Sequence, residues 1–101
     1  MIRIVVIGAG GRMGKTIVAC VDNTEGVGIT GGTEYSGHPA IGSDLGELSG
    51  IGKKNILVVE NIEGALTDCD VIIDFTTPES SIKTLNAAVS CEKAVVIGTT
   101  G

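Results

Sequence analysis

Short runs of aliphatic, largely β-branched residues recur along the chain and constrain its fold more than any other feature. Five of these runs have the length of strands: Ile2–Ile7, Val27–Thr33, Ile56–Val59, Val71–Phe75 and Ala94–Ile97. The runs are continuous rather than alternating between apolar and polar residues, which is typical of strands whose sheet is covered on both faces. The sequence therefore predicts a buried, parallel sheet.

Helical patterns lie between these runs. After the first run, one face of a helix would collect the apolar residues Met13, Ile17, Val18 and Val21. Before the last run, Thr77 is suited to cap a helix that Pro78 begins. We also predict a short helix at Ile62–Thr67, and one helical turn near Asp44–Leu48 inside the otherwise irregular loop 36–55.

Strands that alternate with helices predict an α/β fold. The expected architecture is a Rossmann-type doubly wound parallel sheet of about five strands in the order 3-2-1-4-5. A chain of 101 residues supports a single core, so residues 1–101 are expected to form one dinucleotide-binding domain. The fifth run leads into Gly98–Gly101, where the sequence stops, and we expect a sheet truncated after its fifth strand.

Composition argues against several classes of function. A net charge of −5 disfavours binding to nucleic acid or to an anionic membrane, because both need basic surface. No apolar stretch approaches the ~20 residues that span a bilayer, and no secretory signal pattern is present, so a cytoplasmic protein is expected. Cys20, Cys69 and Cys91 have no short spacing, which predicts buried thiols and neither a disulfide framework nor a metal site.

The first apolar run leads directly into glycines at Gly8, Gly11 and Gly14. Glycine permits a tight turn with positive φ and lets the backbone approach a pyrophosphate, which the N-terminus of the following helix attracts. By itself this spacing fits a structural turn as well as a nucleotide-binding one. A phosphate-binding P-loop is disfavoured, because Gly8 stands one residue too far from the Gly14-Lys15-Thr16 that would complete it.

An acidic residue is a second mark of a dinucleotide site. It is expected about 20 residues after the glycine turn, at the end of the second strand, where its carboxylate accepts hydrogen bonds from ribose hydroxyls. Glu34 stands at that distance from Gly14. The alternative is a solvated surface glutamate with no ligand.

Three motifs together resemble one family. They are Gly8-Ala9-Gly10-Gly11-Arg12-Met13-Gly14, Asp74-Phe75-Thr76-Thr77-Pro78-Glu79 and Gly98-Thr99-Thr100-Gly101. In this order they are similar to the N-terminal domain of the 4-hydroxy-tetrahydrodipicolinate (dihydrodipicolinate) reductases. The loop from Gly37 to Leu48 also resembles that family's loop after its second strand, so the resemblance covers nearly the whole chain.

The resemblance implies both a reaction and a cofactor site. The reaction belongs to lysine and diaminopimelate biosynthesis, and passes a hydride from NADH or NADPH to a dipicolinate precursor. Gly8 to Met13 would contact the pyrophosphate, and Glu34 would contact the adenosine ribose. Gly98, Thr99 and Thr100 would lie beside the nicotinamide. The complete implied set is Gly8, Ala9, Gly10, Gly11, Arg12, Met13, Glu34, Tyr35, Phe75, Thr76, Gly98, Thr99 and Thr100. A core position for Phe75, and a simple turn at Thr99 and Thr100, are the alternatives.

The sequence departs from the family pattern beside Glu34. The family often carries a basic residue there that pairs with the 2′-phosphate of NADPH, and here that position is Tyr35. A carboxylate at Glu34 would repel this phosphate and a neutral Tyr35 would not compensate. We therefore expect NADH to be favoured, with NADPH still usable because Arg12 could reach the phosphate.

Catalytic residues are not expected in this chain. The resemblance assigns the proton donor and the substrate-binding residues to a C-terminal domain that is absent here, together with most contacts of a homotetramer. The chain alone is therefore predicted to be inactive. His38 is the single histidine, and we predict that it is exposed rather than catalytic. Alternative functions are a free-standing NAD-binding sensor and a small dehydrogenase acting on another substrate.

Overall fold

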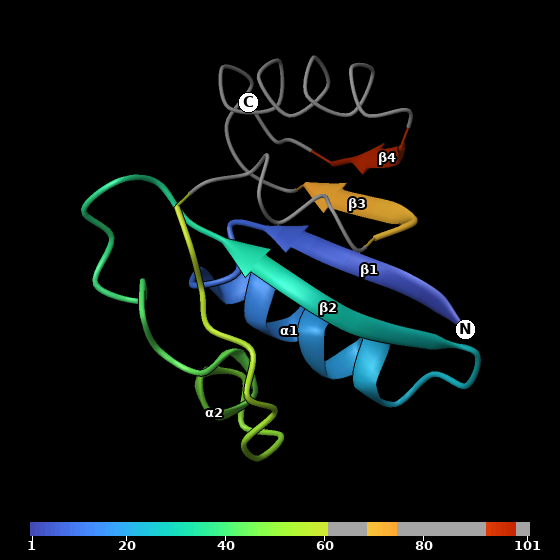
Figure 1. Ribbon diagram of the computed structural model, residues 1–101, viewed down its shortest axis with the longest axis horizontal. Coiled ribbons are helices and arrows are strands. Elements are labelled where there is room, and N and C mark those ends of the chain that lie inside the picture. The colour runs from blue at the N-terminus through green and yellow to red at the C-terminus, as the bar shows by residue number, and fades with distance from the viewer. Residues whose placement is uncertain (61–68, 75–92, 99–101) are drawn as a thin grey trace.

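A parallel sheet of four strands forms the centre of the molecule, seen in a computed structural model that describes residues 1–60, 69–74 and 93–98 (Figure 1). The strands lie in the order β2-β1-β3-β4 and pair in parallel. Their bounds are β1 Ile2–Ile7, β2 Val27–Thr33, β3 Val71–Asp74 and β4 Ala94–Ile97. The predicted α/β class, the parallel sheet and the inner position of the first strand are confirmed.

The inner strand β1 is apolar on both faces, and both faces are covered. Ile4 and Val6 belong to one cluster of buried side chains, which includes Val18 of the helix that follows. Val5 and Ile7, which point to the other face, belong to a second cluster. Because neither face meets water, the run from Ile4 to Ile7 has no need to alternate with polar residues.

Two helices were expected in the described part of the chain, and both are present. Helix α1 (Arg12–Asp22) lies against one face of β1 and β2 (Figure 1). Helix α2 (Leu45–Leu48) is a single turn, and the side chain of Asp44 caps it by accepting from the backbone N–H of Glu47. The helices predicted at Ile62–Thr67 and after Thr77 lie outside the described residues.

The prediction of a strand at Ile56–Val59 is wrong, although the last residue of the segment lies beside the end of β2. Val59 makes only an isolated parallel bridge with Thr33. Val58 turns its carbonyl away from β2 and accepts from the backbone N–H of Gly42 in the preceding loop. Because the segment divides its backbone hydrogen bonds between β2 and this loop, no continuous ladder forms, and the sheet has four strands instead of about five.

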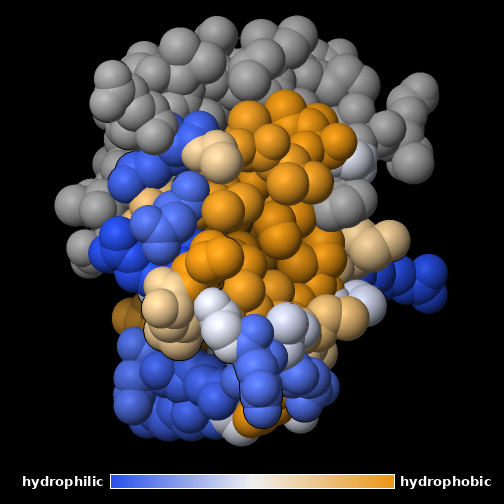
Figure 2. Space-filling view, turned by 90° about the vertical axis from the view of Figure 1, so that its right-hand side faces the viewer, coloured by the Kyte–Doolittle hydropathy of each residue, from blue (hydrophilic) through white to orange (hydrophobic). Residues whose placement is uncertain are grey.

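The described sheet leaves large apolar side chains exposed on β4. Val96 is 52% exposed and Ile97 38% exposed. On the face shown in Figure 2, hydrophobic residues form a continuous surface in the centre, with hydrophilic residues below it. No helix among the described residues is long and apolar enough to cross a membrane.

The cysteines divide between the core and the surface. Cys69 is buried, as predicted, and Cys91 lies outside the described residues. The prediction of a buried thiol is wrong for Cys20, which is exposed on α1. The helical repeat explains this, because Val18 and Val21 face the core while Cys20, two residues after Val18, faces outward.

Candidate functional site

The carboxyl ends of all four strands meet at one edge of the sheet. Ile7 pairs with Thr33 on one side and with Asp74 on the other, and Asp74 pairs with Ile97. The residues that follow these strand ends therefore line a single edge, where open parallel sheets bind their ligands. Three of the predicted site residues, Gly8, Glu34 and Gly98, come directly after this row.

The glycine turn begins at Gly8, where the backbone leaves β1. Gly8 has φ 80°, a conformation that glycine adopts without strain. The backbone N–H groups of Gly8 and Ala9 both donate to the carbonyl of Thr33, at 2.9 and 3.1 Å, and so fix the turn against the end of β2. The methyl of Ala9 is fully buried in the core, so only the backbone of this residue is left to face a ligand.

Gly14 lies in the first turn of α1, beneath the glycine turn. A Cβ added there would overlap the carbonyl oxygen of Gly8 and come within 2.8 Å of the Cα of Ala9. A side chain would therefore push α1 away from β1. Gly14 therefore permits close packing of α1 against the turn that follows β1.

The N-terminus of α1 points into the same edge. Its N-cap, Gly11, has no side chain with which to cap the helix, and no acidic residue occurs in the first turn. Arg12 and Met13, which begin the helix, are both exposed. Without an internal anion in its own first turn, this positive helix end is suited to a phosphate.

Glu34 lies over the glycine turn and is not a freely solvated side chain. Its Oε2 accepts from the backbone N–H of Gly10 at 2.7 Å, and the side chain is only 10% exposed. The neighbouring Tyr35 is 62% exposed. The structure therefore brings the predicted acidic residue and the glycine turn into direct contact, across 24 positions of sequence.

The prediction that His38 is exposed is wrong. Its side chain is 19% exposed, and Nδ1 accepts from the backbone N–H of Ala40 at 2.9 Å. Nε2 lies 3.7 Å from Oε2 of Glu34, and the ring packs against Tyr35 at 4.9 Å between centroids. The tight turn formed by residues 35–41 explains this burial, because the N–H of His38 donates to the Tyr35 carbonyl and folds the chain back.

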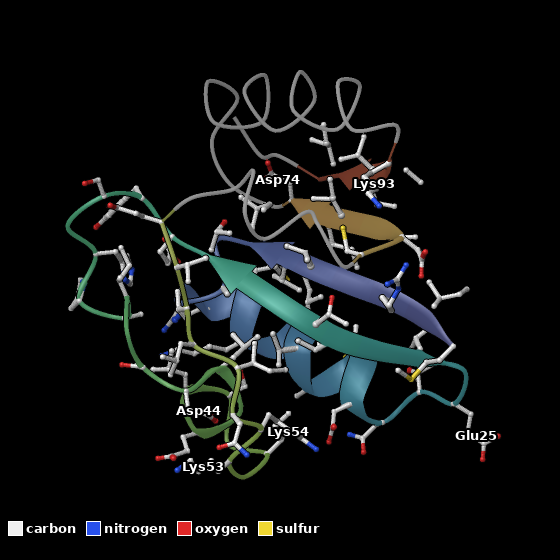
Figure 3. The ribbon with its side chains drawn as sticks, viewed as in Figure 1. Glu25, Asp44, Lys53, Lys54, Asp74 and Lys93 are labelled. Carbon is white, nitrogen blue, oxygen red and sulfur yellow. The ribbon has the colours of Figure 1, made fainter. Side chains whose placement is uncertain are left out.

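The other end of the edge is described in part. The backbone N–H of Gly98 donates to the carbonyl of Asp74 at 2.8 Å, and the side chain of Asp74 is fully buried at the carboxyl end of β3 (Figure 3). Four predicted site residues lie outside the described residues: Phe75, Thr76, Thr99 and Thr100. Among the described residues, no three His, Cys, Asp or Glu side chains form a group that could hold a metal ion.

A cavity of about 260 Å³ lies away from this edge. It is bordered by the first half of β2, by α1 and by the α2 region, and an ion pair of 3.0 Å between Lys54 and Asp22 stands at its rim. Most of its lining is aliphatic: Met1, Val18, Val27, Ile29, Leu45, Ile51 and Ile56. It contains none of the predicted site residues, and the features that suit a dinucleotide all lie at the carboxyl edge.

Comparison with known proteins identifies the family of the chain. The model of the family described as "Dihydrodipicolinate reductase, N-terminus" matches residues 2–101. The chain belongs to this family. Curated members include the 4-hydroxy-tetrahydrodipicolinate reductases of Geotalea daltonii, 42% identical, and Citrifermentans bemidjiense, 43% identical, both over 101 residues. The chain is matched in full in each comparison and spans 38% of the length of each relative.

Solved structures show the same fold. A dipicolinate-bound dihydrodipicolinate reductase from Paenisporosarcina sp. TG-14 is 30% identical, with a TM-score of 0.71, and the match covers all of this chain and 38% of that one. The amine dehydrogenase of Mycobacterium smegmatis is 28% identical, with a TM-score of 0.80, over 95% of this chain and 29% of that one. The Rossmann-type fold of the chain is therefore shared with a dihydrodipicolinate reductase and with an amine dehydrogenase.

Proposed function

We propose that this chain is the nicotinamide-dinucleotide-binding part of a 4-hydroxy-tetrahydrodipicolinate reductase. The observation that carries the proposal is the convergence, at one sheet edge, of the glycine turn, the open N-terminus of α1 and the carboxylate of Glu34. Family membership supports the reaction that we propose for the whole protein, the reduction of a dipicolinate precursor in lysine and diaminopimelate biosynthesis.

The residues present fit a dinucleotide. Gly14 leaves room for the turn to lie directly on α1, so that the helix end reaches the edge where a pyrophosphate would bind. Glu34 offers carboxylate oxygens to ribose hydroxyls, and Gly98 stands beyond the last strand, where the nicotinamide end would lie. When bound, the reduced nicotinamide supplies the hydride.

In this proposal the chain's own residues bind and orient the cofactor, and the residue that donates the proton lies elsewhere in the whole protein. Hydride transfer requires a substrate held against the nicotinamide and an acid that protonates the product. His38, the one histidine of the chain, is packed against Glu34 and Tyr35 on the side of β2. We therefore assign catalysis to the rest of the whole protein, because the chain spans 38% of the length of its relatives. We also propose that the whole protein is a cytoplasmic homotetramer.

NADH is the favoured cofactor in this proposal. Glu34 places a negative charge where NADPH carries its 2′-phosphate, and the following residue, Tyr35, contributes no positive charge. Arg12 is exposed at the start of α1 and provides a cation for residual NADPH binding.

The test is a fluorescence titration of the chain with NADH and, separately, with NADPH, after circular dichroism has verified its fold. We expect saturable binding of both cofactors, with a lower Kd for NADH. A folded chain that binds neither cofactor would overturn the proposed function, and a lower Kd for NADPH would overturn the cofactor preference alone.

A further inference from the structure

The imidazole of His38 has a defined orientation over the glycine turn. The backbone N–H of Ala40 donates to Nδ1 at 2.9 Å, so Nδ1 carries a lone pair and no proton. The neutral ring therefore carries its proton on Nε2. This N–H faces Oε2 of Glu34 across 3.7 Å, which is too long for a hydrogen bond but a favourable approach of a dipole to a carboxylate.

The space around Gly10 shows how tightly this arrangement is packed. A Cβ added to Gly10 would lie 2.7 Å from Cε1 of His38, 2.8 Å from Cβ of Ala40 and 3.0 Å from Oε2 of Glu34. Three groups from the loop after β2 therefore meet the glycine turn at one point. The Glu34 carboxylate, only 10% exposed, has the Gly10 amide on one side and the His38 ring on another.

We propose that His38 is a positioning residue that fixes the carboxylate of Glu34 and thereby sets the discrimination between NADH and NADPH. This inference rests on the proposed function. A carboxylate that is free to turn away would tolerate the 2′-phosphate of NADPH, whereas a carboxylate confined between Gly10 and His38 stays in place and repels it. The ring acts through Glu34 and need not touch the cofactor.

Two substitutions separate the two contacts of the ring. His38→Asn keeps an acceptor near the N–H of Ala40 but is too short to reach Glu34. His38→Gln extends an amide toward Glu34 but gives up the acceptor at the Nδ1 position. Both variants and the wild-type chain are titrated with NADH and with NADPH, and the measured quantity is the ratio of the two Kd values.

We expect His38→Asn to lower the Kd ratio of NADPH to NADH by about tenfold, the factor that corresponds to 1.4 kcal/mol of lost discrimination. His38→Gln should keep the wild-type ratio. A loss of structure alone would weaken the binding of both cofactors equally and leave the Kd ratio unchanged. An unchanged ratio in His38→Asn would therefore overturn the inference. A ratio that falls only in His38→Gln would overturn it as well. If the folded wild-type chain binds neither cofactor, the proposed function fails first and this inference fails with it.

Discussion

Two carboxylates in the segment between β2 and β3 accept backbone hydrogen bonds, but to very different extents. Asp44 accepts from the N–H groups of Glu47, Lys54 and Ile56, at 3.0, 3.0 and 3.1 Å. Glu34 accepts from Gly10 at 2.7 Å, and its other oxygen has only a long contact of 3.4 Å with the N–H of Tyr35. The Asp44 carboxylate is therefore fully used by backbone donors of its own loop, whereas the Glu34 carboxylate retains an oxygen for a ligand.

This difference separates a structural acid from a candidate binding acid. Asp44 joins the start of α2 to residues 54–56 and so closes the loop upon itself, at the side of the molecule away from Asp74 (Figure 3). Glu34 instead contacts the glycine turn, at the edge where the strands end. Burial of the carboxylate does not distinguish them, whereas the number of donors and the position on the sheet do.

The largest effect on stability should come from a substitution at the carboxyl edge of the sheet, Gly14→Ala. The new methyl would overlap the Gly8 carbonyl, which belongs to the backbone and has no room to yield. We expect a loss on the order of 3 kcal/mol in the free energy of unfolding, despite the better helix propensity of alanine. Urea unfolding followed by circular dichroism measures it.

Gly11→Ala is the matched control for that experiment. A Cβ at Gly11 would lie 3.5 Å from the Gly8 carbonyl oxygen, an ordinary van der Waals contact, and Gly11 has φ −84°. Its cost should stay below about 1 kcal/mol. Equal losses in the two variants would contradict the close packing assigned to Gly14.

Substitution of Asp44 should reduce stability more than binding. Asp44→Asn places an amide NH₂ opposite backbone N–H donors, and Asp44→Ala leaves all three donors without their acceptor. We expect a clearly lower thermal midpoint in both variants and, below that midpoint, an unchanged Kd for NADH. The exposed neighbour Glu47→Gln should leave the midpoint near its wild-type value. A selective loss of NADH affinity in Asp44→Asn would break the distinction between the two acids.

Substitution of Glu34 should have the opposite profile. Glu34→Gln removes the charge that ribose hydroxyls would meet, and hydrogen bonds to charged groups contribute about 1.5–3 kcal/mol, so the Kd for NADH should rise at least about tenfold. Glu25→Gln changes an exposed carboxylate on the α1–β2 turn and should leave the Kd unaltered. An unchanged Kd in Glu34→Gln would assign Glu34 to the structural class with Asp44.

The sequence predicts the regular elements and the Asp44 turn better than it predicts the surroundings of Glu34. Strand positions, α1 and the Asp44 turn follow local periodicity and capping, which a sequence displays directly. The apolar run Ile56–Val59 resembles a strand equally well whether its backbone pairs with one partner or divides between two, so its outcome depends on the surrounding loop. The contact of His38 with Glu34 depends on the path of residues 35–41, which no repeat encodes.

A third carboxylate, Asp70, should have the smallest effect on stability, and the pH dependence of that effect can be compared with that of Asp44. Arg3 holds the pKa of Asp70 at about 2, through its side chain first and its backbone N–H second, and both side chains are partly exposed. The N–H of Lys54, ahead of those of Glu47 and Ile56, likewise lowers the pKa of Asp44, although burial opposes the shift. For both groups the folded pKa lies below the unfolded value of 3.8, so their stabilisation is complete above that value and is lost as pH falls through the folded pKa.

Thermal midpoints of the wild type, Asp70→Asn and Asp44→Asn, measured from about pH 7 to about pH 2, separate these contributions. The gap between wild type and Asp70→Asn should be small at neutral pH, since a partly exposed pair is screened by water, and should close as pH falls from 3.8 toward about 2. The gap for Asp44→Asn should be wider, and should also narrow in acid as the wild-type carboxylate takes up its proton. A wider gap for Asp70→Asn than for Asp44→Asn at neutral pH would show that a charged side chain stabilises a carboxylate more than three backbone donors do. The number of backbone donors would then no longer identify Asp44 as the structural acid and Glu34 as the binding acid.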